Sequence, residues 1–128
     1  MGVSAFSIVG GGGFGAMGTA AYLGNLVIYN DVTTDQTLNL DTAGGMIVYD
    51  VEDNIIVSLA AAVTGRMHTV LFKKGDVGNT PTIAVSGDYA TSLIWVGNQI
   101  NSLTHPIILS IACFEDTSKL YVAMAQQQ

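Results

Sequence analysis

Glycines near the start of the chain form the pattern that most resembles a chemical motif. Gly10, Gly12 and Gly15 have the spacing G-x-G-x-x-G. In dinucleotide-binding proteins such glycines let the backbone approach a pyrophosphate, and an acidic residue after the next strand binds the ribose. Asp31 follows an apolar, strand-like segment and stands where that acid is expected.

The sequence does not predict the helix and the repeated strand–helix units that would have to position these glycines. A helix must follow the motif, but residues 16–23 allow only about two turns, and Gly18 interrupts them. A parallel dinucleotide-binding sheet also needs repeated strand–helix units, whereas the rest of the chain shows strand patterns only. We therefore expect no bound cofactor.

The two histidines do not form a metal site by their spacing. His68 and His105 have no Cys or His partner at the separations that zinc ligands use. We expect His68 on the polar face of a strand and His105 in a loop before Pro106. Cys113 lies in an apolar run, so we expect it to be buried as a small hydrophobic side chain.

Asp50, Glu52 and Asp53 are the group of residues that most resembles a set of oxygen ligands for a metal ion. A calcium loop is denser in ligands than this, and a solvated turn is the simpler interpretation. No serine stands in the context of a nucleophile elbow, and no nucleophile, base and oxyanion hole come together in the pattern. We therefore expect neither a catalytic nor a metal site, and a protein that is not an enzyme.

From residue 25 onward the chain alternates short strand patterns with turn signals. Asp116 to Ser118 is typical of a tight hairpin turn. The absence of long helical periodicity favours a single antiparallel β-sandwich of jelly-roll type, with eight or nine short strands. The expected strands cover residues 26–29, 37–40, 46–51, 54–59, 67–73, 80–85, 93–96, 106–114 and 119–124.

The surface chemistry of such a domain would be unusual for a monomer. Only 11% of the 128 residues are charged, whereas about 25% is ordinary for a soluble domain. Burial against other subunits would explain the deficit, and a monomer coated with Ser, Thr, Asn and Gln is the alternative. The net charge of −6 and the lack of a basic patch argue against direct binding to nucleic acid or to anionic membranes.

The first 24 residues differ from the rest, because they hold eight of the 15 glycines and no charge. We expect two parts: a glycine-rich apolar arm over residues 1–24 and a β-sandwich domain over residues 25–128. The glycines and the missing basic residues argue against a signal peptide or a membrane helix. Left in water, the arm's apolar side chains would be adhesive, so we expect them to pack on a neighbour. They are Phe6, Ile8, Val9, Phe14, Met17, Tyr22 and Leu23.

The order of motifs from Thr34 onward resembles a β-domain that recurs in tailed-bacteriophage structural proteins. The matching segments include an Asn-initiated apolar strand at residues 54–59, a strand ending in Lys73, a Gly/Asn-rich loop at residues 75–79, and a late Trp95. A long apolar strand at residues 107–114, a hairpin turn and an aromatic strand follow. The Pro-Gly-Gly stretch of that family near its Trp is absent here.

This resemblance implies a non-enzymatic virion protein, commonly a homotrimer. A domain of this size with one short arm would be a capsid decoration, or cement, protein that binds the major capsid protein between capsomers. The alternative is a tail-fibre or tail-tip adhesin that binds a host surface glycan. In that case exposed tip-loop residues would engage the glycan: Tyr89, Trp95, Asn98 and Asn101.

Overall fold

The structure, a computed structural model, describes residues 19–127, and of Thr19 and residues 21–23 it describes the backbone alone. This part of the chain is all-β and contains no helix. Its ten strands are β1 (Thr19–Leu23), β2 (Leu26–Val32), β3 (Gln36–Asn39), β4 (Met46–Val51), β5 (Ile55–Ala60), β6 (Met67–Lys74), β7 (Ile83–Gly87), β8 (Ser92–Trp95), β9 (Ile107–Ala112) and β10 (Lys119–Gln126). Each of the nine strands expected from residue 25 onward is confirmed to within a few residues at its ends.

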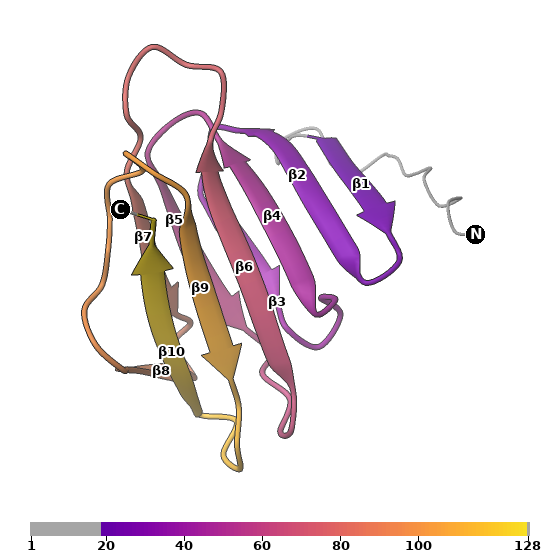
Figure 1. The fold of residues 1–128 in the computed structure, drawn as a ribbon. Coiled ribbons are helices and arrows are strands. Elements are labelled where there is room, and N and C mark those ends of the chain that lie inside the picture. Colours follow the sequence, from indigo (N-terminus) through magenta and orange to yellow (C-terminus); the bar gives the residue numbers. More distant parts are fainter. Residues whose placement is uncertain (1–18, 128) are drawn as a thin grey trace.

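The strands form two sheets that face each other (Figure 1). Seven strands pair in the order β1-β2-β4-β6-β9-β10-β8, and three pair in the order β3-β5-β7. From β2 to β7 the chain alternates between the sheets, and each strand lies parallel to the strand two places earlier. The chain therefore winds as a short β-solenoid, one coil stacked on the next.

The expected antiparallel jelly roll is wrong, and the reason lies in the connections. A jelly roll folds back on itself in antiparallel pairs. Here each loop after β2 to β6 carries the chain across to the opposite sheet, so the strand that returns is parallel to its predecessor. Among the strands of the described residues, antiparallel pairing occurs between β1 and β2 and around β9, which pairs with β6 and β10. An isolated antiparallel bridge also joins Thr82 and Ser102.

The hairpin between β9 and β10 is confirmed at the expected turn. The Asp116 carboxylate accepts hydrogen bonds from the Ser118 backbone N–H at 2.9 Å and from the Ser118 hydroxyl at 2.7 Å. The Asp116 carbonyl accepts the Lys119 N–H at 2.9 Å. These bonds to the charged oxygen lower the pKa of the Asp116 carboxyl, and Lys119 adds to the effect.

The core lies between the two sheets and is organised in ladders across the coils. Tyr29, Tyr49 and Phe72 occupy the same register on β2, β4 and β6. The ring centroids are 5.1 Å apart in the first pair and 5.6 Å in the second, with interplanar angles of 17° and 13°. Strands about 4.8 Å apart bring equivalent side chains to this stacking distance. Val27, Ile47 and Val70 form a parallel aliphatic ladder.

The ladders reveal an internal near-repeat that the strand pattern did not predict. Leu-Val-Ile-Tyr at residues 26–29 and Met-Ile-Val-Tyr at residues 46–49 are paired residue by residue. A repeat of about 20 residues is the sequence signal of stacked coils. β1 begins at Thr19, within the expected arm, and joins the sheet through β2.

Phe72→Ala should lower the free energy of unfolding by about 3–5 kcal/mol, because Phe72 is fully buried and ends the aromatic ladder. Urea denaturation followed by circular dichroism measures this change. Lys74→Ala on the same strand is the control. The Lys74 side chain is exposed, so its truncation should change stability by less than about 0.5 kcal/mol. Equal losses in both variants would contradict the ladder's role.

Candidate functional site

His68 is buried in the core, so its expected position on a polar strand face is wrong. It alternates with Val70 and Phe72 along β6 and points between the sheets with them. Its Nδ1 lies 2.8 Å from the Gly44 carbonyl oxygen, which can only accept, so Nδ1 carries the proton. Its Nε2 is buried and has no hydrogen-bond partner.

The expected positions of His105 and Cys113 are confirmed. His105 is exposed in the turn before β9, where its carbonyl accepts a hydrogen bond of 2.9 Å from the Gln126 side chain. Cys113 is buried as a free thiol. Within residues 19–127, no three His, Cys, Asp or Glu side chains gather as metal ligands. The same residues include no helix long and apolar enough to cross a membrane.

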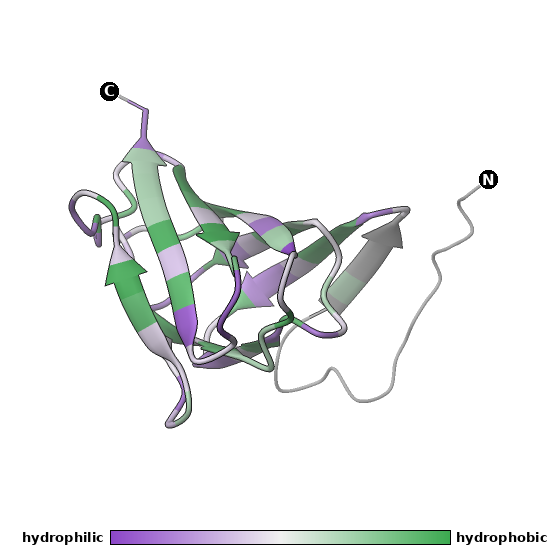
Figure 2. Ribbon diagram, turned by 90° about the horizontal axis from the view of Figure 1, so that it is seen from below, coloured by the Kyte–Doolittle hydropathy of each residue, from purple (hydrophilic) through white to green (hydrophobic). Residues whose placement is uncertain are grey.

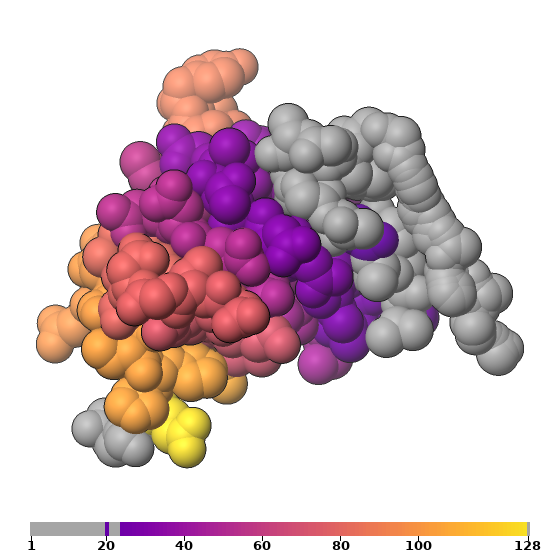
Figure 3. Space-filling view, turned by 90° about the horizontal axis from the view of Figure 1, so that it is seen from above, coloured from indigo at the N-terminus to yellow at the C-terminus, as the bar shows by residue number. Residues whose placement is uncertain are grey.

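An acidic rim lies where β2, β4 and β6 end, and it consists of Asp31, Asp50, Glu52 and Asp76. The loops that carry these residues adjoin one another in Figure 3, as neighbouring indigo, magenta and coral segments. A hydrogen bond with Asp31 raises the pKa of Glu52, and the charges of Asp31, Asp50 and Asp76 raise it further. The rim therefore holds a proton more readily than separate carboxylates would.

Two of the three acids noted in the sequence, Asp50 and Glu52, belong to the acidic rim. Asp53 belongs to its own turn, where its carboxylate accepts the Asn54 N–H at 2.8 Å. Asp31 and Asp76 replace it in the rim, because they come from the coils before and after. A contact across coils has no local sequence signal, although the near-repeat, once aligned, would have superposed the three strand ends.

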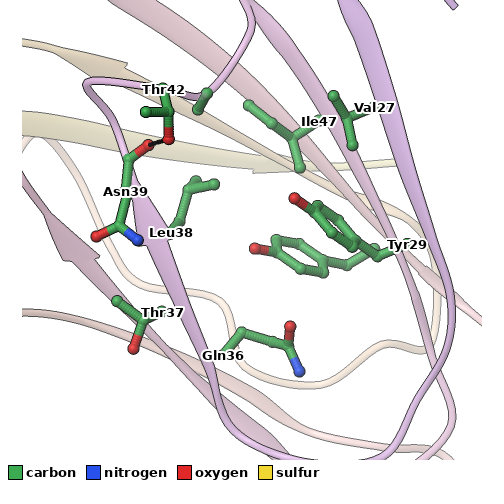
Figure 4. A pocket seen from close by; sticks show the side chains of 10 residues that line it. Val27, Tyr29, Gln36, Thr37, Leu38, Asn39, Thr42 and Ile47 are labelled. Carbon is green, nitrogen blue, oxygen red and sulfur yellow. Dashed lines mark hydrogen bonds between the residues drawn. The ribbon is translucent and has the colours of Figure 1, made fainter. Parts of the chain in front are cut away.

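A pocket of about 350 Å³ opens against the first coil (Figure 4). Tyr29 and Tyr49 form one wall, and β3 forms the other with Gln36 and Leu38. Burial raises the pKa of the Tyr49 phenol, with a smaller contribution from Tyr29, so the hydroxyl stays protonated at neutral pH. The lining combines aromatic faces with amides and hydroxyls. It offers packing and hydrogen bonding, and the described residues around it include no charged side chain.

The outer face of the seven-stranded sheet is turned toward the viewer in Figure 1. Fourteen outward side chains from β2, β4, β6, β8, β9 and β10 lie there in three rows across the strands. None is charged, and we call this surface the uncharged face. Its rows are Ile94, Tyr121, Ala112 and Met67; Ala123, Ser110, Thr69, Met46 and Leu26; and Ala125, Ile108, Leu71, Val48 and Ile28.

Charges border the uncharged face without entering it. Asp50 and Lys73 are paired in the next row toward the acidic rim, and Lys119 lies at the opposite end beside Ser92. In Figure 2 most strands carry green segments, interrupted by white and purple ones, and several loops are purple. A sheet with one solvated side normally alternates apolar and polar residues. This sheet is largely apolar on both sides.

A hollow of about 240 Å³ lies at one corner of the uncharged face. Met67, Tyr121 and the neighbouring Val96 and Phe114 surround it. The Phe114 and Tyr121 rings make an edge-to-face contact with centroids 5.4 Å apart. Phe114 is 67% exposed and Val96 is 60% exposed, so large apolar side chains stand open to water here.

Three of the four expected tip-loop residues, Tyr89, Asn98 and Asn101, are exposed, and Trp95 is not fully exposed. Tyr89 is fully exposed in the β7–β8 turn, and Asn98 is exposed after β8. Trp95 is half-buried on β8 and packs against the core. Asn101 is tied to β7, because its side-chain amide donates to the Ile83 carbonyl at 2.9 Å.

The arm residues expected to make contacts lie mostly outside the described part of the chain. This applies to Phe6, Ile8, Val9, Phe14 and Met17, and also to the glycine motif. The backbone of Tyr22 and Leu23 belongs to β1, opposite Val27 and Leu26. The structure therefore attaches the end of the expected arm to the edge of the seven-stranded sheet.

Comparison of the chain with protein-family models, curated protein sequences and solved structures finds no match.

Glu52→Gln should make the protein more stable than the parent chain at pH 7. The raised pKa means that the folded chain favours the protonated carboxyl, so ionisation at neutral pH costs stability. This cost falls as the pH drops from 7 toward the unfolded pKa of about 4. Denaturant titrations across that window should show the advantage of the variant shrinking toward zero.

Asp116→Asn is the control, and its effect on stability at pH 7 should be opposite to that of Glu52→Gln. Its carboxyl has a lowered pKa, so the ionised form stabilises the fold above the unfolded pKa and loses that effect as the pH falls. The variant should therefore be less stable than the parent chain at pH 7 and approach it in acid. A pH-independent difference for Glu52→Gln would contradict the shared proton in the rim.

Proposed function

We propose that this protein is a structural subunit of a bacteriophage particle, and specifically a trimeric capsid decoration or cement protein. In this role it lies on the surface of the virion, binds the major capsid protein between capsomers and stabilises the head shell. The observation that carries the proposal is the uncharged face, with exposed Met46, Met67 and Ile108. Monomeric soluble proteins rarely expose continuous apolar patches larger than a few hundred Å².

The physical mechanism is burial of apolar area. An interface of standard size buries about 1,600 Å², of which about 1,000 Å² is apolar, and at roughly 25 cal/mol per Å² of apolar area this contributes about 25 kcal/mol before association costs are subtracted. Repetition of such a contact over the shell would oppose the outward pressure of packaged DNA. The stacked coils suit this task, because the aromatic ladder and the parallel pairing hold the face as one surface.

Exposure of Tyr89 favours a second candidate, a tail-fibre or tail-tip adhesin that binds a host surface glycan. The Tyr89 side chain is fully exposed in the β7–β8 turn, and aromatic rings with a polar end are suited to contacts that are partly apolar and partly wet. Under this candidate, Tyr89→Ala would abolish adsorption to host cells and leave the thermal resistance of the particle unchanged.

Particles that lack the protein should lose DNA at a lower temperature, and in lower salt, than complete particles. A heating series with a DNA-binding dye measures the temperature of release, and re-addition of purified protein should restore it. Equal resistance with and without the protein would exclude the cement role. Electron microscopy of labelled protein gives the copy number, since hundreds per particle indicate the head and a handful indicate the tail.

A further inference from the structure

We propose that the uncharged face is the contact between copies of this chain, and that it packs against the same face of a second copy. The inference rests on the proposed function only for the expectation that the chain assembles, and it gives the uncharged face a second copy as its partner where the proposed function gives it the capsid protein. The face runs across six strands and three rows of side chains. With strands about 4.8 Å apart and rows about 6.7 Å apart, its projected area is on the order of 500 Å².

The area is large enough for a stable contact. Side chains make the accessible area of a surface larger than its projection, so this face approaches the roughly 800 Å² that each partner contributes to a standard interface. Sheets that pack face to face lie about 10 Å apart and interdigitate their side chains. A sheet face with small residues such as Ser110, Ala112 and Ala123 between larger ones is suited to such packing.

The distribution of charge favours a second copy as the occupant. A basic or acidic partner recognised by charge would require complementary charges on this face, and its three rows contain none. The partner surface must therefore be uncharged and apolar as well, and the face itself is a surface with these properties. Each copy carries a net charge of −6, so copies can meet closely only where acids are absent.

The uncharged face has both a hollow and protruding side chains, and this shape is suited to contact with an identical face. The hollow of about 240 Å³ beside Met67 and Tyr121 can receive a side chain from the opposite copy. Ile108, which is 46% exposed, and Met46, which is 53% exposed, protrude elsewhere on the face. Methionine is unbranched and adapts to irregular gaps, which suits a contact formed by two identical surfaces. A contact between the same face of two copies has two-fold symmetry, so this face pairs copies of the chain and does not by itself build the proposed trimer.

A charge placed at the centre of the face should separate the copies. Thr69 is exposed on β6, pairs with Ser110 on β9 and lies in the middle row. The full chain should sediment as an oligomer at micromolar concentration, and Thr69→Glu should raise its dissociation constant at least 100-fold and give monomers. Thr82→Glu is the matched control, because Thr82 is exposed beside β7 in the other sheet, and it should assemble like the parent chain.

Mixing acidic and basic variants tests whether the face meets itself. Thr69→Glu and Thr69→Lys should each be monomeric alone, and native mass spectrometry of their mixture should show mixed oligomers, because opposite charges then meet across the contact. Circular dichroism confirms that each variant folds. Oligomers of Thr69→Glu as stable as those of the parent chain, or monomers from Thr82→Glu to the same extent, would overturn the proposal. So would a mixture that stays monomeric.

Results for the particle separate this inference from the proposed function. If the parent chain is monomeric in solution at all accessible concentrations yet binds phage heads, the face serves the shell, and the contact between copies is overturned while the function stands. If the chain assembles through this face and phage particles do not contain it, the function fails and the contact stands.

Discussion

Parallel stacking of equivalent strands in successive coils is the constraint on which the rest of the structure depends. Because β2, β4 and β6 share one register, Tyr29, Tyr49 and Phe72 meet as a ladder of rings, and Val27, Ile47 and Val70 meet beside them. A shift of one residue would turn every inward side chain outward. The ladders therefore fix which residues form the core, which form the uncharged face, and where the strand ends meet.

The acidic rim follows from the same register. Strands that run in parallel end at the same edge, so the acids that follow β2, β4 and β6 are brought together although they are about 20 residues apart. Their mutual repulsion is one local cost of the solenoid arrangement, and Glu52 reduces it by hydrogen bonding to Asp31. The cost is tolerable because the rim is open to water, which screens the charges.

The ends of the coil stack explain the departures from a regular solenoid. Stacked repeats leave an open core at their termini unless different elements cover it. At one end β9 and β10 pair in antiparallel fashion next to β6, and at the other β1 extends the larger sheet beyond β2. The smaller sheet has no such extension, and the pocket between β3 and the two tyrosines lies there. The large area of the seven-stranded sheet, and with it the uncharged face, results from these added strands.

The sequence by itself determined the local structure of residues 25–127. Alternating β-branched and aromatic residues marked nine strands, Asp116 to Ser118 marked the hairpin, and the low charge content indicated a surface suited to contact with other proteins. Only the tertiary structure decided that these strands form parallel coils, that His68 points inward, and that Asp31 and Asp76 join Glu52. The physical reason is that alternation along a strand specifies two faces and no partner. Partners depend on where each loop carries the chain, and that is settled by the packing of residues distant in sequence.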